Sequence, residues 1–71
     1  MTIKKKYPYE VDISLHRERY NELLAWLHGQ GHKLRDTVEF GKNFCDAQGM
    51  VSQQVFFKES GPAAMFKLAW G

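Results

Sequence analysis

The stretch YPYEVDI at residues 7–13 decides the fold of this 71-residue chain, because its side chains alternate between two faces, one of them apolar and aromatic. A period of two, built from aromatic and β-branched residues, is typical of a strand with one buried face. Working outward, the pattern predicts a strand over residues 3–13. Pro8 has no N–H to donate to a ladder, which favours an edge position for this strand. One face carries Tyr7, Tyr9, Val11 and Ile13, and the other carries Lys6, Pro8, Glu10 and Asp12.

A helical period follows this strand. Over residues 14–28 the apolar side chains fall on one half of a helix at about 100° per residue. Either Ser14 or Asp12 is placed to cap its first turn. Gly29 and Gly31 predict its end, because glycine adopts the left-handed C′ conformation at little cost. The apolar half holds Leu15, Tyr20, Leu23, Leu24, Trp26 and Leu27.

The rest of the chain predicts two strands and a helix. Alternation over 32–40 and 50–58 indicates strands, joined by a nine-residue loop over 41–49. The segment 60–70 begins with Ser-Gly-Pro and contains three alanines, which favour a helix. The opposing signal is a strand-like alternation of Phe66, Leu68 and Trp70.

The element order is therefore β-α-β-β-α, in one small α+β domain over residues 1–71 with a basic N-terminal arm over residues 1–6. We expect a three-stranded antiparallel sheet with the helices on one face. This is a truncated ferredoxin-like arrangement, which stops before the fourth strand. If the last segment is a strand, the order is β-α-β-β-β instead.

Composition and charge limit the functional classes. The chain is 44% hydrophobic with a net charge of +2, which is ordinary for a folded protein and not for a disordered one. Three consecutive lysines, Lys4, Lys5 and Lys6, supply the excess, and the rest of the chain is close to neutral. A dedicated nucleic-acid binder spreads basic residues over a whole face. We therefore expect the lysines to keep a strand edge soluble, with phosphate contact as the alternative.

The sequence also bears on location and redox chemistry. No apolar run approaches the ~18–20 residues that span a bilayer, and the N-terminus has no hydrophobic signal segment. The single cysteine, Cys45, cannot form an internal disulfide. We expect a cytoplasmic protein, held together by packing, with no membrane contact and no cofactor.

The missing fourth strand points to a binding surface. The first strand would lack a neighbour on one side, so its backbone groups would be free to pair with another chain. We expect a protein partner or a second copy there, and nucleic acid at the basic arm as the alternative. The predicted partner-binding residues are Lys4, Lys5, Lys6, Tyr7, Tyr9 and Val11, together with Phe44, which is either a plug over the core or an anchor for the partner.

Two residue sets suggest chemistry, and both are better explained as structural. His28 and His32, with Cys45 or Asp46, match the ligand types of zinc. Glycines between the histidines end the helix, so we expect no metal site. His16 falls inside the apolar arc of the helix and is a conceivable base for Cys45. No orienting group or oxyanion site accompanies that pair, and we expect no catalytic residues and no enzyme.

Two polar residues interrupt the apolar faces of the second and third strands. Asp36 and Gln53 both occupy inward positions, where an unpaired carboxylate is costly. Because the two strands are hairpin partners, the pair is expected to meet and form a hydrogen bond. The alternative is a β-bulge that turns one of them outward.

The stretch Val55-Phe56-Phe57-Lys58-Glu59, followed by Ala63, Ala64 and Phe66, resembles the third strand and second helix of RNA-recognition-motif-like domains. That family stacks bases on aromatic residues of its outer sheet face. The outward positions of the third strand here are Ser52, Gln54 and Phe56, and the glycine-rich aromatic signature is absent. The resemblance therefore implies the fold and not RNA binding.

The C-terminal run Phe56–Gly71, which ends FKLAWG, resembles small uncharacterised proteins of tailed phages. That resemblance implies an accessory viral protein that binds a macromolecule in the host cytoplasm. With the free strand edge, it favours a non-enzymatic protein-binding accessory or inhibitory module.

Overall fold

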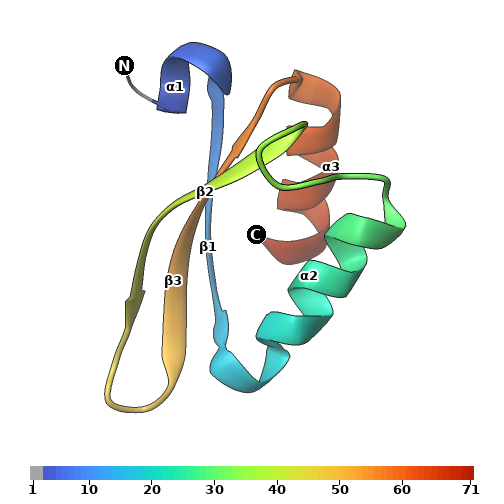
Figure 1. Cartoon of the computed structure of the whole chain (residues 1–71). Coiled ribbons are helices and arrows are strands. Elements are labelled where there is room, and N and C mark those ends of the chain that lie inside the picture. The colour runs from blue at the N-terminus through green and yellow to red at the C-terminus, as the bar shows by residue number, and fades with distance from the viewer. Residues whose placement is uncertain (1–2) are drawn as a thin grey trace.

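A computed structural model describes residues 3–71 of the chain (Figure 1). Its elements follow the order helix, strand, helix, strand, strand, helix, with one short 3-10 turn. They are α1 (Ile3–Lys6), β1 (Tyr9–His16), η1 (Arg17–Arg19), α2 (Tyr20–Gly29), β2 (Val38–Cys45), β3 (Met50–Phe57) and α3 (Ser60–Trp70).

The three strands form one antiparallel sheet in the order β1-β3-β2. β3 is the central strand, and β1 and β2 are the two edges. The predicted α+β class and β-α-β-β-α order are confirmed, and the last segment is a helix. A fourth strand beside β1 is absent from the part of the chain that the structure describes.

Helices α2 and α3 lie on one face of the sheet, as expected, and neither of them covers the other face, which we call the open face (Figure 1). The main core fills the space between these helices and the sheet. It comprises Val11, Ile13, Leu15, Leu23, Leu27, Val38, Val51, Val55, Phe57, Ala63 and Phe66. Two more buried aromatic residues, Tyr7 and Phe56, lie outside this cluster.

The N-terminal boundary differs from the prediction, because residues 3–6 form α1 and the strand begins at Tyr9. Pro8 separates the two elements: the residue before a proline is pushed out of the helical region, and proline cannot donate to a ladder. The strand also continues beyond residue 13, since Leu15 keeps the alternation and is buried.

The predicted start of the first long helix was wrong. His16 ends β1 instead of lying in the helix, and α2 begins only at Tyr20. The cap of the intervening turn is His16, whose Nδ1 accepts a hydrogen bond from Glu18 N at 3.2 Å. Neither Ser14 nor Asp12 has that role, because both belong to the strand.

The second strand lies later in the chain than predicted, at Val38–Cys45, and the hairpin loop is much shorter than nine residues. The loop is a turn over Asp46–Gly49, closed by a hydrogen bond from Gly49 N to the Asp46 carbonyl at 3.1 Å. Asp46 Oδ1 also accepts hydrogen bonds from Gln48 N and Met50 N. Gly49 has a φ of 86°, which glycine adopts without strain.

Candidate binding edge and open-face hollow

The free edge of β1 is long and regular. Its eight residues pair one by one with β3 and show no register shift. The strand contains no proline or lysine, which blunt the edges of natural sheets, and its charged residues are Glu10, Asp12 and, when protonated, His16. Its outward N–H and C=O groups therefore form a template onto which another strand can pair.

The opposite edge is built differently. β2 has a register shift between Phe40 and Asn43, where Gly41 and Lys42 form a bulge against β3. Bulges and lysines both discourage strand addition. The sheet thus has one blunted edge and one regular edge, and the regular edge is the one left by the missing fourth strand.

The two faces of β1 offer different chemistry. Val11, Ile13 and Leu15 are buried on the helix side, where α3 packs against the strand. The open face carries polar residues in alternate positions, namely Glu10, Asp12, Ser14 and His16. An added strand would therefore continue an apolar layer on one side and meet polar groups on the other.

The predicted contact residues divide into two groups. Lys5, Lys6 and Tyr9 are exposed, whereas Tyr7 and Val11 are only 4% and 7% exposed. Tyr7 and Val11 can therefore contact a partner only through their backbone atoms. The Tyr7 ring has the amines of Lys6 and Lys58 each 5.8 Å from its centre.

Lys4 belongs to α1, and its side chain lies outside the described residues.

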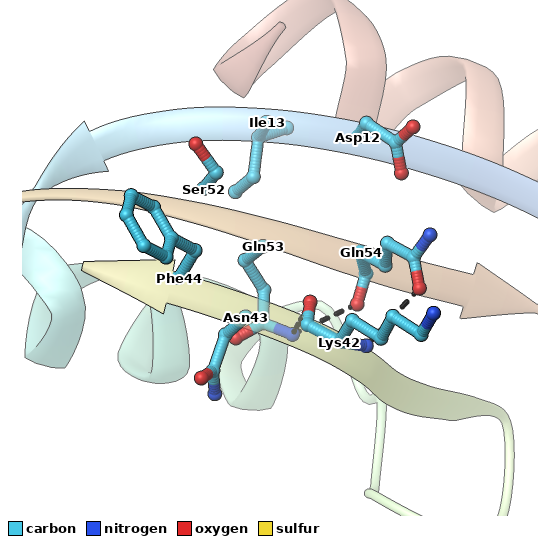
Figure 2. Close-up of a pocket in the computed structure, with 8 residues that line it drawn as sticks. All are labelled: Asp12, Ile13, Lys42, Asn43, Phe44, Ser52, Gln53 and Gln54. Atoms are coloured by element: carbon cyan, nitrogen blue, oxygen red, sulfur yellow. Dashed lines mark hydrogen bonds between the residues drawn. The ribbon is translucent and has the colours of Figure 1, made fainter. Parts of the chain in front are cut away.

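A hollow of about 360 Å³ lies on the open face of the sheet (Figure 2). Phe44 flanks it on the β2 side and is 67% exposed. Ser52 lies opposite Phe44 in the register and forms part of the floor. Because Phe44 lies on the face away from the helices, it does not plug the core. The lining is Asp12, Ile13, Lys42, Asn43, Phe44, Ser52, Gln53 and Gln54.

Two adjacent glutamines hold the bulge that forms one side of this hollow (Figure 2). Gln53 points to the helix side and is 1% exposed. Its Nε2 donates to the carbonyls of Gly41 and Lys42 at 3.3 and 3.4 Å, and its Oε1 accepts from the Tyr20 hydroxyl at 2.9 Å. From the open face, Gln54 Oε1 accepts from Lys42 N at 3.0 Å. The bulge is thus fixed from both faces.

The predicted hydrogen bond between Asp36 and Gln53 is wrong. Asp36 lies exposed in the turn before β2, where its N–H donates to the Lys33 carbonyl at 3.1 Å. A bulge does occur, but it lies at Gly41 and Lys42, and it leaves Gln53 inward. Gln53 remains buried because Tyr20 and the bulge carbonyls satisfy its amide.

Gly41 is required for the close packing of this bulge. A Cβ at this position would overlap Cε2 of the buried Phe56 ring and lie 2.8 Å from Gln54 Oε1. We expect Gly41→Ala to lower the free energy of unfolding by about 1–3 kcal/mol, as overpacking does. Urea denaturation measures the change. The control is Gly61→Ala, whose Cβ has no neighbour within 4 Å and should leave stability within about 1 kcal/mol of the parent. Equal losses would contradict the packing at Gly41.

Burial raises the pKa of the Tyr20 hydroxyl above its ordinary value, because a phenolate is poorly solvated there. An unfolded tyrosine has a pKa of about 10. The raised pKa therefore favours the folded state over the unfolded state at all pH values below about 10. This contribution is lost as the pH rises through the folded-state pKa. We expect the free energy of unfolding to fall more steeply above pH ~10 in the parent than in Tyr20→Phe, measured by urea denaturation. Parallel curves would contradict the assignment.

The histidines and the cysteine do not come together. His28 is exposed at the end of α2. His32 is half-buried, with Nδ1 3.1 Å from Thr37 Oγ1 and its ring against Phe57. Cys45 is exposed, and its thiol donates to the Asp46 carbonyl. Among the described residues, no group of three or more histidine, cysteine, aspartate or glutamate side chains could hold a metal ion.

Sequence reasoning missed most of the hollow because it placed residues 41–49 in a loop. The signal that could have corrected this is the sequence Asp46-Ala47-Gln48-Gly49, a typical four-residue turn with aspartate first and glycine last. Recognising it moves Lys42, Asn43 and Phe44 into a strand. Ser52 was correctly predicted to face outward.

Comparison with protein-family models, with curated proteins and with solved structures finds no significant match. In residues 3–71, no helix combines the length and the apolar character needed to cross a membrane.

Proposed function

We propose that this protein is a small non-enzymatic binding module that docks a strand of another protein along the free edge of β1. Its role would be that of an accessory or inhibitory subunit, phage-encoded and acting in the host cytoplasm. One observation carries the proposal: β1 is regular and contains no bulge, proline or lysine, whereas β2, the other edge of the same sheet, is bulged and carries Lys42.

The open face supports the same assignment. A strand added to β1 lies about 4.8 Å from it. The side chains that the added strand places on the open face would then lie beside Asp12 and Ser14, next to the hollow that Phe44 flanks. A long side chain of the partner would lie over Asp12 at the near side of the hollow, and backbone pairing along β1 would supply the rest of the contact. Phe44, on β2, is about 14 Å (three strand spacings) from the added strand.

Nucleic acid is the less supported partner. The basic residues Lys5 and Lys6 are exposed in α1, but the open face beside them carries Glu10, Asp12 and, on β2, Glu39. Phosphate groups would be repelled across that face. A protein strand has no such penalty.

A peptide selection tests the proposal without knowledge of the natural partner. Random twelve-residue peptides are selected on dilute immobilised protein, and the binders are then studied by amide hydrogen exchange. We expect binders to slow exchange in Tyr9–His16 and to leave the β2 edge, Val38–Cys45, unchanged. Binders that protect β2 or only α2 would overturn the proposal, as would the absence of any peptide that protects β1.

A further inference from the structure

We propose that, when no partner is bound, two copies of this chain pair along β1 in antiparallel orientation, with Ile13 on the two-fold axis. This inference rests on the proposed function, because it uses the same edge. It makes dimerisation and partner binding mutually exclusive, so the dimer is a resting form that a partner strand displaces.

Only some registers of the two β1 strands keep the buried residues of both copies on the same face. In a continuous antiparallel sheet, directly opposed residues point to the same face. The buried residues Val11, Ile13 and Leu15 must therefore oppose one another, and the open-face residues must do likewise. This condition holds only when the two-fold axis passes through a residue of β1, so that this residue opposes its own copy. Two such registers pair seven of the eight residues of β1: one has Asp12 on the axis and the other has Ile13.

Charge decides between these two registers. With Ile13 at the centre, Glu10 opposes His16 of the second copy and Asp12 opposes Ser14, and each contact occurs twice by symmetry. With Asp12 at the centre, the two Asp12 carboxylates oppose each other, and like charges directly opposed are destabilising. The open face of β1 has its two carboxylates, Glu10 and Asp12, toward one end and Ser14 and His16 toward the other, which makes it self-complementary in the Ile13-centred register.

Helix α3 adds apolar surface to this contact. It packs against β1, so pairing through β1 brings the α3 helices of the two copies onto the same face of one six-stranded sheet. The outer side of α3 is apolar: Met65 is 56% exposed and Leu68 is 87% exposed. A strand pair alone buries little surface, and helix contact across the axis would enlarge the interface toward the size of stable dimers.

Charge substitutions at Ser14 test the pairing by sedimentation velocity over a concentration series. Ser14 opposes Asp12 of the second copy. Ser14→Asp should therefore raise the dimer Kd about 2- to 30-fold, and Ser14→Lys should lower it by a similar factor, from two symmetric cross-strand pairs. The matched controls are Asn21→Asp and Asn21→Lys. Asn21 is exposed on α2, outside the paired edge and the hollow, so these should leave the Kd unchanged.

Cysteine cross-linking in a Cys45→Ser background tests the register. Asp12→Cys combined with Ser14→Cys should link two copies under oxidation, whereas Asp12→Cys alone should not. Linkage by the single variant would place Asp12 at the axis and overturn the register.

A protein that stays monomeric, or a dimer that ignores the Ser14 charge, would overturn the inference. Peptide protection of β1 would then still support the proposed function, so the two failures are distinguishable.

Discussion

Replacing Phe66 with alanine is expected to leave the domain barely folded at 25 °C. The Phe66 side chain is fully buried, with ring centres 5.2 Å from Phe57 and 5.8 Å from Trp26. It joins α3 to both the sheet and α2. Truncating such a side chain costs about 3–5 kcal/mol, while a domain of this size has roughly 4–11 kcal/mol in total. Urea denaturation followed by far-ultraviolet circular dichroism measures the loss.

The control lies on the same helix. Leu68 is 87% exposed, so Leu68→Ala should change the free energy of unfolding by less than about 0.5 kcal/mol in dilute, monomeric protein. Both variants remove an apolar side chain from α3 and leave an alanine of high helix propensity. A comparable loss in the two would mean that α3 does not pack through Phe66.

The sequence is most informative where one period runs without interruption. Val11, Ile13 and Leu15 alternate with polar residues, and all three are buried as a strand face requires. The C-terminal segment was ambiguous because Phe66 and Trp70 fit either period. Its alanines indicated the helix correctly, since they are good helix formers and poor strand residues.

The errors arise where tertiary contacts override a local period. Leu15 and His16 fit the helical pattern of the residues after them, but pairing of Leu15 with Val51 and of His16 with Met50 extends β1. In β2, the bulge at Gly41 and Lys42 breaks the alternation, so the strand reads as a loop. Contacts from Gln53, far along the chain, stabilise that bulge, and no local pattern could reveal them.

The candidate site was also predictable from the sequence only in part. The free edge follows from the ferredoxin-like interpretation of the element order, because without a fourth strand the first strand has a neighbour on one side only. Phe44 was singled out as an aromatic residue in the predicted loop, but the face on which it lies depends on the position of the bulge. The contrast between a regular β1 and a bulged β2 requires the register of both strand pairs.

The second large effect is expected at Gln53. Gln53→Leu keeps a similar side-chain volume but removes the amide that the Tyr20 hydroxyl and the carbonyls of Gly41 and Lys42 contact. Each buried polar group left without a partner costs about 1–3 kcal/mol. Because the bulge lies at a sheet edge, water can form hydrogen bonds with some of these groups in place of Gln53. We expect a loss of about 2–4 kcal/mol in the free energy of unfolding, measured by urea denaturation.

Gln54→Leu is the matched control, because it removes a neighbouring amide that is only half-buried. That amide accepts a hydrogen bond from Lys42 N across the bulge and donates one to Glu10 Oε2 at 3.4 Å. Solvent can replace both bonds, so the expected loss is below about 1 kcal/mol. Amide exchange separates local from global effects. In Gln53→Leu, exchange at Lys42, Asn43 and Phe44 should accelerate more than in the centre of β3, because the bulge loses its anchor first. Uniform acceleration would mean that Gln53 supports the core as a whole, and that Phe44 does not depend on it for its place beside the hollow.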